Sequence, residues 1–145
     1  MTFAALLPVL LAGESGSRAS YVGGTVPGLA GGTDGILQLT GEDSLLFRTR
    51  KATLEIPYEK VNLLEYGQKA SRRFAAAILV SPMLLLSKSR KHYLTVGYTD
   101  ADGQQQAVVF RIDKNHVRPV LAGLEAKTGR KVEYQDNEAR RNGKG

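Results

Sequence analysis

The sequence predicts a mainly β domain that is closed by one C-terminal α-helix, and three observations lead to this prediction. Short apolar segments with β-branched or alternating residues recur along the middle of the chain, separated by clusters of Gly, Asp and Asn. One stretch near the C-terminus shows helical apolar periodicity instead. The chain has 145 residues, 42% of them hydrophobic and 23% charged, a composition that suits one globular domain.

About seven strands are expected ahead of the C-terminal helix. In chain order they are Tyr21–Val26, Ile36–Thr40, Leu45–Thr49, Thr53–Ile56, Val61–Tyr66, Tyr93–Tyr98 and Ala107–Ile112. Pro27–Gly35 is a glycine-rich loop, and Asp102-Gly103 predicts a tight hairpin turn because glycine adopts positive φ at no steric cost. Pro57 indicates a strand end or a sheet edge, since proline donates no hydrogen bond to a ladder.

One amphipathic helix should follow the last of these strands. Its apolar stripe, with the spacing i, i+3, i+4 and i+7, consists of Val117, Val120, Leu121 and Leu124. Asp113 or Asn115 can cap the N-terminus of this helix, and Gly129 suits the position just after its last turn. Beyond the helix, Val132–Tyr134 could add a short strand, and the polar segment 136–145 should be a disordered tail.

The N-terminal segment Met1–Ala12 is a short apolar run before a polar stretch, which is typical of the hydrophobic region of a signal peptide. Small residues near Ala12–Gly13 or Ala19–Ser20 could form a cleavage site. No Lys or Arg precedes the run, which a start codon assigned too late would explain. We therefore expect a signal peptide over residues 1–19, a folded domain over 20–135, and export to the periplasm or cell envelope. The alternative is an N-terminal helix packed on the domain of a cytoplasmic protein.

The surplus positive charge of the chain lies in Lys69–Lys91, which we call the basic–apolar–basic segment. The chain carries 20 Lys and Arg against 14 Asp and Glu, a net charge of +6. Six of the basic residues and none of the acids lie in this segment, so the rest of the chain is formally neutral. Between the basic ends, Phe74–Leu86 is apolar except for Ser81. As a helix this run would reach ~20 Å, less than the ~30 Å of a bilayer core.

We interpret the segment as a membrane-surface or partner-binding element, an apolar helical insert whose cationic ends meet anionic head groups. Each basic residue near an anionic surface contributes about 1 kcal/mol. The candidate contact residues are Lys69, Arg72, Arg73, Phe74, Ile78, Leu79, Met83, Leu84, Leu85, Lys88, Arg90 and Lys91. The alternative is a helix that folds back to cover the domain, with its apolar side chains buried and its basic side chains solvated.

Seven strands followed by one C-terminal helix resemble the pleckstrin-homology-like (PH-like) barrel domain. The chain is also similar to a group of small uncharacterised bacterial proteins of PH-like type. The residues that carry this similarity are YVGGTVPGL at Tyr21–Leu29, IPYEKVNLLEYGQK at Ile56–Lys69, SKSRKHYLTVGY at Ser87–Tyr98 and LEAKTGRKVEYQD at Leu124–Asp136. The resemblance implies a partly open barrel of about seven antiparallel strands capped by one C-terminal α-helix. The apolar insert, residues 70–90, would precede the last hairpin, and export is expected because members of the group begin with a signal peptide.

PH domains that bind phosphoinositides carry basic residues on their first two strands and the connecting loop. In this chain that loop, Pro27–Gly35, contains no Lys or Arg, so the usual inositol-phosphate site is not expected. Catalysis is not expected either. The chain has no Cys, and His92 and His116 are far apart in the sequence, so no nucleophile–base pair or metal site emerges. The neighbouring Arg90 and Lys91 should depress the pKa of His92, which makes it a poor base.

The sequence therefore predicts a non-enzymatic binding or scaffold module without cofactors. Its expected partner is an anionic membrane surface or a membrane protein, bound through residues 69–91. The alternative is a soluble protein-interaction module that uses a strand edge or the groove beside the helix. Nucleic-acid binding is a more distant alternative, because the aromatic residues are not interleaved with the basic clusters as base stacking would require.

Overall fold

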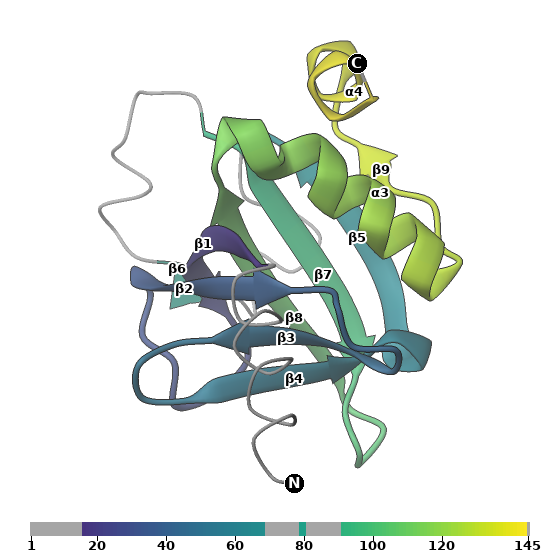
Figure 1. Ribbon diagram of the computed structural model, residues 1–145. Helices are drawn as coiled ribbons and strands as arrows, with labels where there is room; N and C mark the ends of the chain where they lie inside the picture. Colours follow the sequence, from purple (N-terminus) through teal and green to yellow (C-terminus); the bar gives the residue numbers. More distant parts are fainter. Residues whose placement is uncertain (1–15, 69–78, 81–90, 145) are drawn as a thin grey trace, which may run out of the picture.

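The described residues, 16–68, 79–80 and 91–144 of a computed structural model, form nine strands and two α-helices (Figure 1). The strands are β1 (Ser17–Gly24), β2 (Thr33–Gln38), β3 (Ser44–Arg48), β4 (Thr53–Pro57), β5 (Val61–Gly67), β6 (Leu79–Val80), β7 (Tyr93–Thr99), β8 (Gln105–Ile112) and β9 (Glu133–Tyr134). The helices are α3 (Val117–Thr128) and α4 (Asn137–Lys144), and the short 3-10 turns are η1 (Tyr58–Lys60) and η2 (Lys114–His116). The prediction of a mainly β fold is confirmed, and the seven expected strands correspond to β1–β5, β7 and β8.

All the strands belong to one sheet, in the order β4-β3-β2-β1-β8-β7-β5-β9, and β6 pairs with β1 beside this path. Every pairing is antiparallel except that of β5 with β9. The register of β1 against β8 shifts between Tyr21 and Gly23, and such a bulge bends a strand. The sheet folds so that β2, β3 and β4 run across β5, β7 and β8, while α3 lies over one end (Figure 1).

Aromatic rings fill the space between the two crossed parts of the sheet. Phe110 of β8 is fully buried, and its ring centroid lies 4.9 Å from that of Phe47 on β3 and 6.4 Å from that of Tyr21 on β1. These contacts join strands that are far apart in the sequence. The alternation of apolar residues in each strand therefore produces a single core rather than several local clusters.

Helix α3 seals this core with the apolar stripe that the sequence predicts. All four residues of the stripe, from Val117 to Leu124, are buried. The helix ends at Gly129, whose φ of 72° is left-handed and whose N–H donates to the carbonyl of Glu125. The expected N-terminal caps are wrong, because Asn115 lies inside η2 and Asp113 precedes it. His116 stands at the N-cap position of α3, and neither it nor Asp113 makes a side-chain capping bond.

The folded domain begins earlier than expected. Strand β1 starts at Ser17, which pairs with Leu37 of β2, so residues 17–19 belong to the sheet and not to a segment that precedes it. Cleavage between Ala19 and Ser20 would cut inside β1. Residues 1–15, which contain the apolar run and the other candidate cleavage position, lie outside the described residues.

The expected disordered tail is helical. Asp136 Oδ1 accepts a hydrogen bond of 2.8 Å from the N–H of Ala139, and Ala139 is fully buried. Arg140 lies over the ring of Tyr134, 5.7 Å from its centroid. The sequence of this segment is polar, but one cap and one inward alanine are enough to hold a helix of two turns against the domain.

A tyrosine–histidine pair joins β5 to the start of β7. Tyr66 is fully buried, its ring is nearly parallel to that of His92, and its hydroxyl lies 2.5 Å from His92 Nδ1. Burial and the nearby Tyr134 raise the pKa of Tyr66 to about 12, so this hydroxyl stays protonated at neutral pH. The expected lowering of the His92 pKa is confirmed in direction, and among the described residues burial is its first cause and Lys114 its second, rather than Lys91. Arg90, the other predicted cause, lies outside the described residues.

Acid should destabilise the protein through His92. Its pKa lies below 6.5 in the folded state, so its contribution to stability is complete above pH 6.5 and is lost as the pH falls through the lowered value. We expect the melting temperature to fall as the pH drops below 6.5, with a shallower fall in His92→Gln. Thermal unfolding followed by circular dichroism measures both curves. His116→Gln is the matched control, and an unchanged slope in His92→Gln would remove His92 as the cause.

Candidate functional site

The structure describes two of the twelve predicted contact residues, and one of these only in its backbone. Leu79 lies in β6 and pairs with Gly24 of β1, so the insert is not helical at that point as the sequence led us to expect. Lys91 is half-buried and directly precedes His92, whose carbonyl accepts a 2.9 Å hydrogen bond from Ile112. The other ten, Lys69, Arg72, Arg73, Phe74, Ile78, Met83, Leu84, Leu85, Lys88 and Arg90, lie outside the described residues.

The two places where the basic–apolar–basic segment joins the sheet are neighbours. The chain leaves β5 after Gly67 and enters β7 at Tyr93, and these two residues are register partners. Between them, β6 pairs with the end of β1, where a Cβ on Gly24 would lie 2.6 Å from the carbonyl oxygen of Ala107. The lack of a side chain at Gly24 therefore lets β1 pass close to β8 at the point where β6 joins it.

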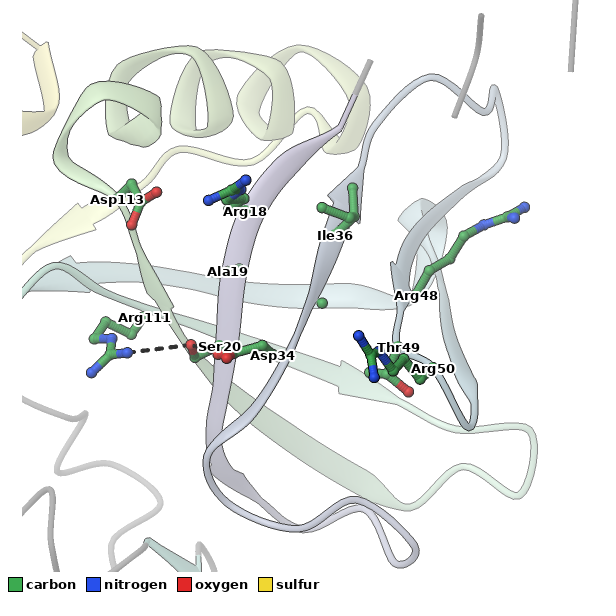
Figure 2. Close-up of a pocket in the computed structure, with 11 residues that line it drawn as sticks. Arg18, Ala19, Ser20, Asp34, Ile36, Arg48, Thr49, Arg50, Arg111 and Asp113 are labelled. Atoms are coloured by element: carbon green, nitrogen blue, oxygen red, sulfur yellow. Dashed lines mark hydrogen bonds between the residues drawn. The ribbon is translucent and has the colours of Figure 1, made fainter. Parts of the chain in front are cut away.

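A second group of basic side chains lies around a hollow of about 600 Å³ on the outer face of the sheet (Figure 2). The sequence did not indicate this group. The hollow is formed by β1, β2, the end of β8 and the turn between β3 and β4. The charged residues that line it are Arg18, Arg48, Arg50, Arg111, Asp34 and Asp113. We call this feature the arginine hollow.

Strand alternation explains why β1 presents polar residues to the arginine hollow. Ala19 and Tyr21 are buried in the core, with exposed fractions of 6% and 1%. Successive side chains of a strand point to opposite faces, so Arg18 and Ser20 take the outer face. Arg18 is exposed there, whereas Ser20 is buried and forms part of the floor.

The strand registers bring the remaining residues to the same face. Ser20 pairs with Asp34 on one side and with Arg111 on the other. In the next row, Arg18 pairs with Ile36, which in turn pairs with Arg48. Residues directly opposite each other across strands share a face, so four strands contribute to one surface.

A chain of hydrogen bonds orders the floor of the hollow. The hydroxyl of Ser20 donates to Asp34 Oδ1, and Arg111 Nη2 donates to Ser20 Oγ at 3.4 Å. Figure 2 shows this Ser20–Asp34 pair between Arg111 on one side and Arg50 on the other, whereas the side chain of Arg48 is directed away from it. Arg50 and Arg111 are thus the arginines that flank the floor most directly.

The formal charge of the residues that line the hollow is positive. Four guanidinium groups and two carboxylates line it, which gives a formal charge of +2. None of the four guanidinium groups forms an ion pair with a carboxylate in the described part of the chain. Arginine stays charged at all accessible pH values and offers several N–H donors in a planar array. The arrangement can therefore hold an anion, above all one with several oxygen atoms.

Other chemistry is not assembled in the parts of the chain that the structure describes. Within residues 16–68, 79–80 and 91–144, no three His, Asp or Glu side chains come together as metal ligands. No helix among these same residues is long and apolar enough to cross a membrane. The sequence matches no protein-family model and no curated protein.

Proposed function

We propose that this protein is a non-enzymatic binding module of PH-like architecture that attaches peripherally to an anionic membrane surface. The observation that carries the proposal is the segregation of charge. All the excess positive charge of the chain lies in the basic–apolar–basic segment, at both ends of an apolar run too short to span a bilayer. A segment of this type suits a membrane interface, where cations meet head groups and apolar side chains enter the acyl boundary.

The strand order supports the PH-like part of the proposal. Without the short β6 and β9, the order is β4-β3-β2-β1-β8-β7-β5, followed in the chain by α3. The first four strands form one antiparallel meander, the last three form a second, and β1 joins the two by pairing with β8. This is the arrangement we expect of a partly open barrel with seven main strands and a C-terminal helix.

The places where the segment leaves and rejoins the sheet support a single contact surface. Because Gly67 and Tyr93 are register partners, the two basic ends of the segment begin at the same end of the sheet. Tyr93 is also the register partner of Arg111, a residue of the arginine hollow.

Export to the cell envelope is part of the proposal, with a cytoplasmic location as the alternative.

A charge reversal in the segment tests the proposal. The double variant Arg72→Glu with Arg73→Glu should bind phosphatidylglycerol vesicles at least about 30-fold more weakly, since two contacts of about 1 kcal/mol each are lost and two carboxylates that the surface repels are added. Co-sedimentation with these vesicles at increasing lipid concentration measures the effect. Circular dichroism spectra and melting temperatures of the double variant check that it remains folded.

The matched control reverses two charges on the exposed end of α3 and the turn after it. Lys127→Glu with Lys131→Glu changes the net charge by the same amount and should retain most of the binding. Equal losses in both double variants would indicate a non-specific charge effect and contradict the assigned surface. Unchanged sedimentation of the Arg72/Arg73 variant would exclude membrane attachment through this segment.

One observation favours the alternative of a protein-interaction module. Strand β4 stands at one end of the strand order and pairs only with β3 among the described strands. An extended peptide can add to such an edge through main-chain hydrogen bonds. Capture of a partner that survives deletion of residues 74–86 would support this function instead.

A further inference from the structure

We propose that the arginine hollow is a binding site for a phosphate group in its dianionic form. This site is separate from the basic–apolar–basic segment, and it does not depend on the proposed membrane attachment. Its ligand chemistry is that of a phosphate monoester or of inorganic phosphate.

The charge of the hollow suits a dianion. The residues that line it carry a formal charge of +2, to which Arg48 contributes from the rim with its side chain directed away from the floor, and a phosphate monoester carries close to two negative charges at neutral pH. A carboxylate or a phosphate diester carries only one. Since the guanidinium groups have no carboxylate partner among the described residues, a dianion would compensate the charge that the fold leaves in place.

Guanidinium donors are distributed around the hollow. Arg111 and Arg50 stand on opposite sides of the Ser20–Asp34 pair, and Arg18 lies on the same face beside Asp113 (Figure 2). A phosphate group presents oxygens in several directions, so it suits a hollow with donors on more than one side better than a carboxylate with two coplanar oxygens does. The hydrogen bond from Arg111 to Ser20 holds one of these donors in position before a ligand arrives.

Asp34 gives the site an internal test. Its carboxylate accepts the Ser20 hydroxyl and lies between two arginines, so it lowers the positive potential at the floor. An amide at this position keeps an oxygen acceptor for Ser20 but removes the negative charge. Asp34→Asn should therefore bind phosphate more tightly than the parent protein, whereas a merely structural role of Asp34 predicts no gain.

Calorimetric titration of the full chain with inorganic phosphate tests the site directly. We expect Arg50→Gln with Arg111→Gln to raise the dissociation constant for phosphate at least about tenfold, because two charged donors are lost. Asp34→Asn should lower this constant several-fold. The control Lys127→Gln with Lys131→Gln should leave it unchanged. Sulfate should compete with phosphate, and acetate should not. Failure of phosphate to bind the parent protein, or equal binding by the Arg50/Arg111 variant, would overturn the proposal.

Vesicles separate the two sources of such a group. If vesicles that contain phosphatidate, whose head group is a phosphate monoester, displace phosphate from the parent protein, the ligand is a lipid head group. If they do not, the ligand is a soluble phosphate compound. The phosphate site and the membrane surface can be tested separately. If Arg50→Gln with Arg111→Gln loses phosphate binding but still sediments with phosphatidylglycerol vesicles, the loss concerns the hollow alone. If a variant of residues 69–91 loses sedimentation but still binds phosphate, the loss concerns that segment alone.

Discussion

Phe110→Ala should lower the free energy of unfolding by about 3–5 kcal/mol, the largest effect we expect from a single substitution in this chain. The side chain of Phe110, on β8, is fully buried and packs near the rings of Phe47 on β3 and Tyr21 on β1. Removing it takes away the transfer free energy of the ring and leaves a cavity between Phe47 and Tyr21. Because these rings belong to different strands, the surrounding structure can collapse only partly into the space.

Urea denaturation followed by circular dichroism measures the loss. The control is Leu46→Ala, since Leu46 is half-buried and lies on the opposite face of β3 from Phe47. This control should cost about 1 kcal/mol, because less apolar surface returns to water and no interior cavity forms. A loss of under 1 kcal/mol in Phe110→Ala would show that the contact of the two crossed parts of the sheet is not the main source of stability.

Gly35→Ala should lower the free energy of unfolding by about 1–3 kcal/mol, although it adds only one methyl group. A Cβ on Gly35 would lie 2.4 Å from the carbonyl oxygen of Arg48 and 2.8 Å from the ring of Phe47. The carbonyl belongs to the backbone of the neighbouring strand, so relief requires β2 and β3 to move apart. The same movement would shift Asp34 and Ile36, which flank Gly35 in the sequence and line the arginine hollow.

The effect of Gly35→Ala is measured in two ways. Urea denaturation gives the change in stability, and phosphate titration under conditions where the variant is folded should show weaker binding. Gly41→Ala is the control, because the nearest atom to its Cβ would be the carbonyl oxygen of Ser44 at 3.4 Å, an ordinary contact. A Gly35→Ala protein as stable as the Gly41→Ala protein would contradict the close approach of β2 and β3.

The strands and the main helix could be predicted because their signals are local. Alternation of apolar residues within each strand, the stripe of α3 and the glycine after it all depend on residues a few positions apart. The end of the chain could not be predicted in this way. Its helix depends on Ala139 and Tyr134 meeting β5 and α3, and its sequence alone is polar. The short strand expected near Tyr134 does form, as β9.

The arginine hollow shows why a site built across strands is hard to recognise from sequence. Arg18 and Arg111 are almost a hundred positions apart, and only the pairing of β1 with β8 makes them neighbours. One signal was present in the sequence, since Arg48 and Arg50, which both line the hollow, are two positions apart. Segregation of charge drew attention to residues 69–91 instead, because a block of like charges within one segment needs no knowledge of the fold.

The parallel pairing of β9 with β5 has a consequence for self-association. Together with the bond from Arg130 Nε to the carbonyl of Val61 and that from the N–H of Gln135 to the carbonyl of Tyr66, it occupies backbone groups along the outer side of β5. At the other end of the sheet, β4 has no such cover among the described residues. Two copies that joined through their β4 strands would cover the long edge of each, and among the described strands the opposite end of the sheet offers only the two-residue β9 for further pairing. Association of this kind therefore favours a closed pair over the continued growth of a fibril.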